Sequence, residues 1–264
     1  MGVSVTNITL DREALALVVG SAATLNPTVS PNDANNRNLV WNSSNGTVAR
    51  VDNGIVTALS AGTTVITVAT RNGGVTATAN VEVFGVTDAG VEIGGIRWAT
   101  RNVAIPGAFA HNREDAGMFF QWNTRIGWSS TNPLVNYNGG TTWSNANAAG
   151  TSWAAINDPC PAGWRVPYIE ELNALRNVSH NWAYVSGVWG RTFGSMPNQL
   201  FLPAAGVRDS RDGSLGNEGW GMYWSNTQSG NNEARFLVLM MTSVFMGDGD
   251  RAAGQSVRCV AIGD

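Results

Sequence analysis

Short alternating runs of apolar and polar residues fill the first third of the chain and predict β-strands. The runs are rich in Val, Ile and Thr and are separated by turn residues, a spacing typical of an all-β sandwich. Within Thr63–Thr70, residues Thr64, Ile66 and Val68 share one face by the two-residue period, so we expect that face to be buried. The predicted strands are Val5–Leu10, Ala14–Val18, Ala22–Val29, Leu39–Asn42, Ala49–Val51, Ile55–Ala58, Thr63–Thr70 and Val75–Val83.

Turn residues and one tryptophan complete the prediction for this part of the chain. The segments Asp52–Gly54 and Arg71–Gly74 contain Asn-Gly steps, which supply the positive φ angles that tight hairpins need. Trp41 is expected to anchor the core with its large ring. The segment contains no histidine or cysteine, and its carboxylates are dispersed. We therefore expect a stalk that holds no ligand site of its own.

The composition changes after Phe84, and the change predicts two domains. Residues Gly85–Gly90 are small and polar, which is typical of a short linker. Ten of the eleven tryptophans lie after residue 85, so the second part is expected to form an aromatic-rich core of its own. We place the domains at residues 1–85 and 86–264 and expect a mainly β protein with one or two helices in the second domain.

The second domain is expected to begin with a hairpin and to end with strands. Val91–Ile93 and Ile96–Ala99 flank two glycines that suit a tight turn, while residues 101–152 are irregular and predict long loops held by aromatic anchors. Ile169–Val178 has apolar residues on one helical face and acidic residues in its first turn, which predicts a helix. The last predicted strands are Met222–Asn226, Ala234–Phe245 and Gln255–Ile262.

Composition and charge favour an extracellular protein. Charged residues make up 13% of the chain, well below the roughly 25% of an average soluble protein, and there are 31 glycines. The net charge is −3, and the 16 basic residues, all arginine, are dispersed, which argues against nucleic-acid binding. No apolar run reaches the roughly 20 residues that span a bilayer. No secretion signal begins the chain, and we expect that one was removed before Met1.

The two cysteines, Cys160 and Cys259, leave two alternatives open. In an oxidising compartment they can form one long-range disulfide, and otherwise they are two buried free thiols. Pro159 and Pro161 restrict the backbone around Cys160 and present it in one orientation. A disulfide across this long loop would contribute on the order of 4 kcal/mol in the chain-entropy model.

Three blocks in the first domain carry a resemblance to a known family. They read ITLDREALALVVGSAATLNPTVSPNDA, LVWNSSNGTVARVDNGIVTALSAGTTVITV and TATANVEV, and they resemble the bacterial immunoglobulin-like group 2 family over nearly the whole domain. The resemblance implies an immunoglobulin-like sandwich that acts as a surface-displayed spacer in adhesins and other exported proteins. It implies no chemistry.

Five blocks in the second domain carry another resemblance. GGIRWATRN, DPCPAGWRVPYIEEL, LPAAGVRDSRDGS, GMYWSN and AGQSVRCV resemble the FISUMP (major paralogous domain) family over about residues 86–264. That family is similar to C-type lectin domains, to the formylglycine-generating-enzyme-like group and to the variable proteins of diversity-generating retroelements, which implies a C-type-lectin-like α+β fold. One departure is Tyr168, where the family usually has a Thr or Ser that completes a capping box.

The resemblance divides the C-terminal stretch into framework and display. Trp224, Ser225, Gly254, Val257, Arg258 and Cys259 match the family framework and are expected in the core. In retroelement-diversified relatives this stretch carries variable ligand-contacting positions, and an ordinary polar loop is the alternative. The residues expected to point outward and bind a ligand are Glu218, Trp220, Met222, Tyr223, Asn226, Gln228, Asn231, Asn232, Arg235, Phe245, Met246, Asp248, Asp250 and Arg251.

Metal and catalytic signals are weak. Asp248 and Asp250 are close in sequence, as are Asp209 and Asp212, but neither pair fits an EF-hand loop, and we expect solvated turn carboxylates. His111 and His180 are the only histidines, too few for a histidine zinc site. The cysteine pair that formylglycine-generating enzymes use is not reproduced. We therefore expect no metal, no cofactor and no enzymatic activity.

Three functions remain as hypotheses. The first is a surface-displayed ligand-binding protein, an adhesin or receptor-binding protein that binds a protein or glycan on another cell or surface. The second is a structural pilus or envelope component without a small ligand. The third is an enzyme, which would need a deep pocket with His111 or His180 beside a carboxylate. In the first two cases the protein is expected outside the cell, on a cell or virion surface.

Overall fold

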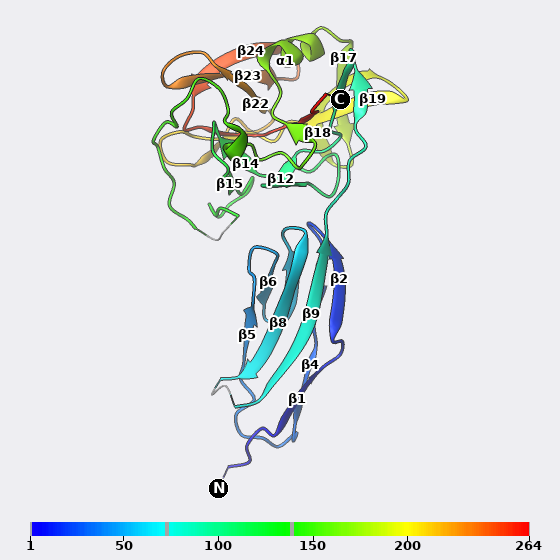
Figure 1. Ribbon diagram of the computed structural model, residues 1–264, viewed down its shortest axis with the longest axis vertical. Helices are drawn as coiled ribbons and strands as arrows, with labels where there is room; N and C mark the ends of the chain where they lie inside the picture. The colour runs from blue at the N-terminus through cyan, green and yellow to red at the C-terminus, as the bar shows by residue number, and fades with distance from the viewer. Residues whose placement is uncertain (1, 72–73, 138–139, 264) are drawn as a thin grey trace. The chain divides into compact units, whose positions relative to one another are not determined.

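A computed structural model describes residues 2–71, 74–137 and 140–263, apart from the side chain of Val18. The chain divides into two compact units, Met1–Val86 and Thr87–Asp264 (Figure 1). The sequence places the domain boundary between residues 85 and 86, one residue earlier. The predicted turn at Arg71–Gly74 includes Asn72 and Gly73, which lie outside the described residues.

The first unit consists of β-strands in three sheets. The sheets have the strand orders β2-β9-β8-β5, β3-β7-β6 and β1-β4, and every pairing is antiparallel except that of β2 with β9. The strands are β1 (Asn7–Leu10), β2 (Ala14–Val18), β3 (Ala22–Thr24), β4 (Pro27–Ser30), β5 (Leu39–Ser43), β6 (Ala49–Asp52), β7 (Ile55–Ala58), β8 (Gly62–Thr70) and β9 (Thr76–Phe84).

The core of this unit follows from the alternation in β8. Thr64, Ile66 and Val68 are all buried, as predicted, because they lie on one face of the strand. Val68 packs against Ile8 of β1 and Val29 of β4, so β8 and the β1–β4 pair enclose a core between them. Trp41 lies against this cluster but is only partly buried, so it flanks the core that we expected it to anchor.

Two details of the chain path explain where strands end. The predicted strand Ala22–Val29 is wrong, because the chain leaves β3 after Thr24 and enters β4, in another sheet, at Pro27. The side chain of Asp11 accepts the backbone N–H of Asn26 at 2.9 Å and fixes the bend between β3 and β4.

The turn between β6 and β7 is the predicted one, and a side chain at Gly54 (φ +85°) would lie 2.6 Å from the carbonyl oxygen of Leu25.

The second unit contains one α-helix, one short 3-10 helix and five sheets among its described residues. The sheets have the strand orders β10-β11-β26-β16, β12-β13, β15-β14-β25-β20-β21, β17-β18-β19 and β22-β23-β24. The elements are β10 (Val91–Ile93), β11 (Ile96–Trp98), β12 (Val103–Ile105), β13 (Ala108–Phe109), β14 (Phe119–Gln121), β15 (Gly127–Trp128), η1 (Ala155–Asn157), β16 (Trp164–Arg165), α1 (Ile169–Arg176), β17 (His180–Val185), β18 (Val188–Ser195), β19 (Asn198–Pro203), β20 (Val207–Arg208), β21 (Leu215–Gly216), β22 (Gly221–Gln228), β23 (Glu233–Leu239), β24 (Val244–Asp250), β25 (Gly254–Gln255) and β26 (Val260–Ala261).

The sheet β22-β23-β24 lies between two hydrophobic clusters. On one face, Trp224 and Phe236 pack edge to face with ring centroids 5.3 Å apart and join the larger cluster. On the other face, Tyr223 and Leu237 pack with Leu172 of α1 in a second cluster. Because the strands alternate, one three-stranded sheet separates both cores and is held from both sides.

Several sequence predictions for this unit need correction. The single strand predicted over Ala234–Phe245 is two strands, β23 and β24, joined by a turn in which Met240 N–H donates to the carbonyl of Ser243 at 2.9 Å. The predicted strand Gln255–Ile262 is reduced to β25 and β26, and the sheet β17-β18-β19 was not predicted. The hairpin β10–β11 and the helix are confirmed, although α1 ends at Arg176.

The start of α1 lacks a capping Ser or Thr and is held by one contact from its own first turn and one from β22. Tyr168 provides no side-chain cap bond, but its own N–H donates to Glu171 Oε2 at 2.7 Å. The next N–H, that of Ile169, donates to Thr227 Oγ1 of β22 at 3.2 Å. Glu171 is held in place by Arg165, whose guanidinium donates to both carboxylate oxygens at 2.8 and 2.7 Å. The helix is therefore capped by its own Glu171 together with Thr227 of the sheet on which it packs.

Glycine in β24 is required by the ring of Phe236. A side chain at Gly247 would lie 2.8 Å from this ring, so we predict that Gly247→Ala destabilises the protein by about 1–3 kcal/mol through overpacking. Urea unfolding measures the change. Gly230→Ala is the matched control, because a side chain there meets Glu233 no closer than 3.9 Å. Equal effects of the two substitutions would contradict this packing.

Candidate functional site

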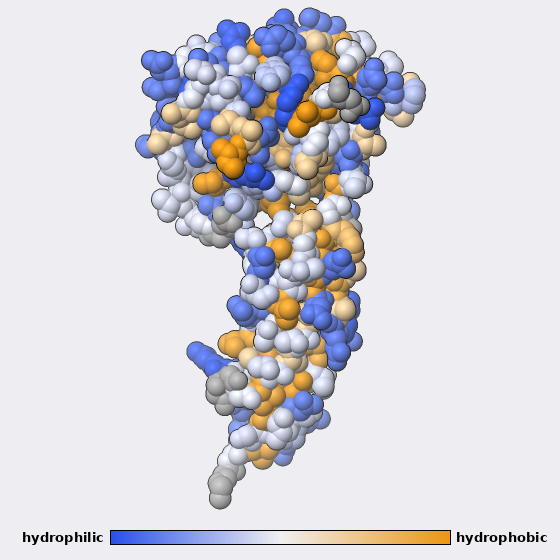
Figure 2. Space-filling model, in the orientation of Figure 1, coloured by the Kyte–Doolittle hydropathy of each residue, from blue (hydrophilic) through white to orange (hydrophobic). Residues whose placement is uncertain are grey.

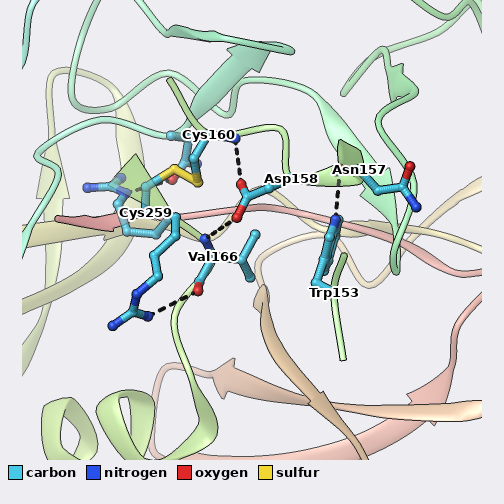
Figure 3. The surroundings of a disulfide bond; sticks show 9 residues. Trp153, Asn157, Asp158, Cys160, Val166 and Cys259 are labelled. Atoms are coloured by element: carbon cyan, nitrogen blue, oxygen red, sulfur yellow. Dashed lines mark hydrogen bonds between the residues drawn. A yellow bond between two sulfur atoms is a disulfide. The ribbon is translucent and has the colours of Figure 1, made fainter. Parts of the chain in front are cut away.

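The predicted disulfide between Cys160 and Cys259 is present, with the two Cα atoms 6.1 Å apart. Figure 3 shows how the turn around Cys160 is fixed: the carboxylate of Asp158 accepts the N–H groups of Cys160 at 2.9 Å and Val166 at 3.0 Å. Burial raises the pKa of Asp158, and these two hydrogen bonds oppose the rise. The disulfide joins this rigid turn to the segment that leads into β26, as the framework interpretation requires.

Arg251 holds the loops at the end of the sheet β22-β23-β24. Its side chain is 2% exposed, and all five of its N–H donors are used within the unit. Nη1 donates to the carbonyls of Ala148 and Gly150 at 3.0 and 2.9 Å, while Nη2 donates to Gln228 Oε1 at 2.9 Å and to the carbonyl of Gly230 at 2.6 Å. Nε donates to the carbonyl of Glu233 at 3.2 Å. One buried cation thus fixes two loops against each other.

Buried arginines of the same kind recur elsewhere in this unit. Arg208 donates to carbonyls of Ser129 and Thr131 at 2.7 Å each, and Arg258 donates to the carbonyl of Ala99 at 3.1 Å. Burial lowers the pKa of Arg258 to about 10, which still leaves its guanidinium protonated at neutral pH. A guanidinium spreads several donors in a plane and can bridge distant carbonyls, whereas an ammonium cannot. Carbonyl bridging gives a structural reason for arginine at these positions in a chain without lysine.

Beside Arg251, one face of the sheet β22-β23-β24 and the loop before β23 are exposed and polar. We call this surface the patch: Asn231, Asn232, Glu233, Arg235, Asp248 and Asp250. Strand pairing places Arg235 opposite Asp248 and Glu233 opposite Asp250, so these four side chains share one face. Arg235 Nε lies 3.4 Å from Asp248 Oδ1, and both side chains remain nearly half exposed. The Asn232 carbonyl accepts the N–H of Arg251 at 2.9 Å, which fixes the loop beside the strands.

The helix α1 divides this face into its two parts. Near the helix, Leu237 and Leu239 are fully buried against Leu172 and Leu175. Past it, the same alternation brings Arg235 to the surface, because α1 has only eight residues and does not cover the whole strand. Figure 2 shows one face of this unit, on which hydrophilic and hydrophobic residues are intermixed.

Four of the predicted display residues point inward, so their predicted exposure is wrong. Met222 faces the larger cluster, and Tyr223 is fully buried with its hydroxyl donating to the carbonyl of Pro203 at 2.7 Å. Burial raises the pKa of Tyr223 to about 12. Asn226 is buried and accepts the N–H of Trp153 at 3.1 Å, and Arg251 is the buried bridge described above. These four side chains therefore pack inside the unit and are not part of the exposed surface.

The remaining predicted residues do not all join the patch. Gln228 is partly buried and accepts from Arg251, so it supports the loop. Met246 and Trp220 are partly buried against the second and the larger hydrophobic cluster, respectively. Phe245 is 40% exposed, but it lies on the opposite face of β24 from Asp248. Glu218 is exposed in the turn before β22, away from the strand positions that form the patch.

One patch residue was missed, and two carboxylates were misplaced. Glu233 was not among the predicted residues, although the alternation in Glu233-Ala234-Arg235 could have put it on the exposed face beside Arg235. Asp248 and Asp250 were expected in a turn, but they lie in β24. Their intervening glycine faces the ring of Phe236 and is a strand residue, not a turn residue.

The candidate catalytic and metal residues are not assembled into a site within the described ranges. No group of three or more His, Cys, Asp or Glu residues suited to a metal is found among the described residues. His111 is exposed, and His180 lies 2.8 Å from Arg191 Nη1 through its Nδ1. Asp209 forms an exposed ion pair with Arg211, which holds the pKa of Asp209 low, at about 2. The Asp209 carboxylate thus accepts hydrogen bonds from Arg211 within its own turn.

Comparison with known proteins assigns the first unit. Residues 4–81 match the bacterial Ig-like domain (group 2), and this part of the chain is such a domain. An uncharacterized protein of Clostridium acetobutylicum is 44% identical over 69 residues, which are 26% of this chain and 7% of that protein. The chain thus spans a small part of the length of this curated relative. The Ig-like domain and the disulfide fit an extracellular protein of the cell surface or envelope.

Solved structures of an S-layer protein share limited similarity with the chain. The match to the S-layer protein rSbsC(31-844) covers 75% of this chain and 25% of that protein, with 13% identity and a TM-score of 0.29. The match to a structure of SbsC domains 5-6 covers 96% of this chain and 97% of that structure, with 14% identity and a TM-score of 0.27. At these TM-scores the similarity carries no argument for fold or function. None of the helices among the described residues has the length and apolar character to cross a membrane.

Proposed function

We propose that this chain is a surface-displayed ligand-binding protein, an adhesin or receptor-binding protein whose second unit presents the patch to a partner. The supporting observation is that exposed, chemically varied side chains are held on a sheet that packs against a hydrophobic cluster on each side. Such a surface binds with little loss of conformational entropy, because its backbone is already fixed. The Ig-like domain acts as the stalk.

The finer assignment rests on the sequence blocks of the second unit. We infer a C-type-lectin-like fold for Thr87–Asp264, in which the patch corresponds to the stretch that varies in retroelement-diversified relatives. This assignment agrees with the division between buried and exposed residues along β23 and β24. A surface whose framework is buried separately from its contact residues tolerates variation at those contacts. The proposal includes no catalytic step, no metal and no cofactor.

The charges of the patch favour a protein partner that supplies basic side chains. Three of its residues are carboxylates and one is a guanidinium. Glu233 and Asp250 lie directly opposite each other, a like-charge arrangement that is unfavourable until a cation lies between them. Asn231 and Asn232 add hydrogen-bond donors and acceptors that adapt to different contacts. A neutral glycan would satisfy the amides but leave this repulsion in place.

We predict that the double substitution Arg235→Ala/Asp248→Ala removes binding and leaves stability almost unchanged. The ion pair between these residues is exposed, so its loss should cost about 1 kcal/mol or less. The full chain would be applied to an array of purified cell-surface proteins and glycans, with and without calcium. We expect the chain to bind a surface protein without calcium. The affinity should fall about tenfold or more in the variant.

The control is Arg211→Ala, which removes an ion-paired arginine that is more exposed than Arg235, 84% against 45%, from a turn outside the patch. It should bind as the unchanged chain does. The proposal fails if no protein or glycan on the array binds, or if both variants bind equally well. Self-assembly of the chain into multimers that the double substitution disrupts would instead favour a structural envelope component.

A further inference from the structure

The hairpin of β17 and β18 exposes a stack of aromatic rings. Strand pairing places Tyr184 opposite Trp189 and Trp182 opposite Arg191, so all four side chains share one face of the sheet. Tyr184 is 60% and Trp189 51% exposed. An uncovered pair of large rings is uncommon on a protein surface and needs a reason.

The rings pack against one another. Trp189 lies nearly parallel to Trp182, at 11° and 6.3 Å between centroids, and its centroid is 4.8 Å from that of Tyr184. Trp182 packs partly against the second hydrophobic cluster, and the guanidinium carbon of Arg191 lies 5.6 Å from its ring. The stack thus runs from the core to the surface, and its outer rings are arranged before any ligand arrives.

Arg191 fixes the base of the stack and is not available to a ligand. Its side chain is 4% exposed, and its Nη2 donates to the carbonyls of Met240 at 2.5 Å and Met241 at 3.0 Å. Its Nη1 lies 2.8 Å from His180 Nδ1. Apart from Arg191 and His180, the strands β17, β18 and β19 and the turn at 240–243 contain no ionisable residue other than Tyr184 itself.

The size of the exposed surface argues against a protein partner. A buried aromatic side chain covers about 150–250 Å², so two half-exposed rings offer about 200 Å². A stable protein interface needs roughly 800 Å² from each partner. A single sugar ring is of the size of an indole, and its axial C–H groups can pack on an aromatic face while its hydroxyls remain in water or bond to the Tyr184 hydroxyl.

We propose that Trp189 and Tyr184 form a binding site for a neutral saccharide, which packs one sugar ring on the exposed aromatic face. The three strands of this sheet and the turn at 240–243 offer no exposed charged side chain for the ion pairs that acidic sugars need. The flat ring of Trp189, with the Tyr184 ring tilted beside it, suits a pyranose. This site is independent of the patch, whose charges favour another kind of ligand. The chain would then hold two binding surfaces of different chemistry.

The test is native affinity electrophoresis of the full chain in gels that contain one polysaccharide each. Neutral glucomannan, xylan, α-mannan and dextran are compared with polygalacturonate and heparin. At least one neutral polysaccharide is expected to slow the protein. Trp189→Ala should weaken that interaction about tenfold or more, and Trp189→Phe, which keeps a ring in the stack, should weaken it less.

Two controls separate binding from folding and from the patch. Met196→Ala removes a side chain that is 76% exposed in the other turn of the same sheet, and it should migrate as the unchanged chain does. The variant Arg235→Ala/Asp248→Ala should still be slowed by the polysaccharide. Failure of the saccharide site and failure of the proposed function of the patch can therefore be told apart. The proposal is overturned if no neutral polysaccharide slows the protein, if only the anionic ones do, or if Trp189→Ala has no effect. A dimer that Trp189→Ala dissociates in sedimentation would overturn it as well.

Discussion

Replacing Arg251 with lysine should destabilise the second unit by about 3–5 kcal/mol. The guanidinium satisfies carbonyls of Ala148, Gly150, Gly230 and Glu233 together with Gln228, and it does so while 2% exposed. An ammonium has three donors on one atom and cannot reach both loops. Each buried acceptor left without a partner costs about 1–3 kcal/mol.

Tryptophan fluorescence during urea unfolding measures this loss, since ten of the eleven tryptophans lie in the second unit. Arg235→Lys is the matched control, because Arg235 is exposed and its replacement should change stability by about 0.5 kcal/mol or less. Hydrogen exchange at residues 228–232 should accelerate in Arg251→Lys alone. If both lysine variants unfold at the same urea concentration, Arg251 is not the bridge described here.

Removing the disulfide is expected to have a comparable effect. Cys160→Ala/Cys259→Ala removes a crosslink between residues 99 positions apart, and the chain-entropy model gives a loss of about 4.7 kcal/mol for a loop of this length. For a unit of this size the melting temperature should fall by about 10 °C. Calorimetry of the oxidised and the doubly substituted chain measures the shift.

The first unit supplies the control within the same molecule. It contains no cysteine, so its own unfolding should not change when the disulfide is lost. A shift of that transition would show that the substitutions act through something other than the crosslink. A second unit that unfolds at the same temperature with and without the disulfide would contradict its stabilising role.

The parts of the fold that the sequence predicted are those in which local patterns decide the structure. The alternation in Thr63–Thr70 gave the buried face of β8, and Asn53-Gly54 gave the turn between β6 and β7. The acidic first turn and apolar spacing gave α1, within two residues at its end. Periodicity and turn chemistry act over a few residues, so a single sequence suffices to recognise them.

Predictions failed where distant contacts override local patterns. The glycines of β24 look like turn residues until the ring of Phe236 is known to fill the space beside them. The hairpin β17–β18 has its own turn signal at Ser186-Gly187, with φ angles of +48° and +89°, and this signal could have been recognised. Its significance lies in the aromatic stack, which depends on strand register and is not visible in composition.

The candidate site was only partly predictable for a related reason. The family resemblance predicted which stretch is displayed at the surface, and Arg235, Asp248 and Asp250 of that stretch are exposed on one face of the sheet. Arg251 and Tyr223 are residue types that often contact ligands, yet both are buried here. In a sequence, a buried arginine that bridges carbonyls cannot be distinguished from an exposed one. Only the three-dimensional contacts separate the two roles.

The central claim is that residues 219–260 consist of a buried framework and an exposed patch that can vary independently. A library of all single substitutions in this stretch, displayed on cells and selected for resistance to protease, tests it most directly. The account predicts that Asn231, Asn232, Arg235 and Asp248 accept most residues other than glycine and proline, whereas Trp224, Tyr223, Arg251 and Arg258 accept almost none. Equal intolerance in both groups, or free substitution of Arg251 and Tyr223, would contradict it.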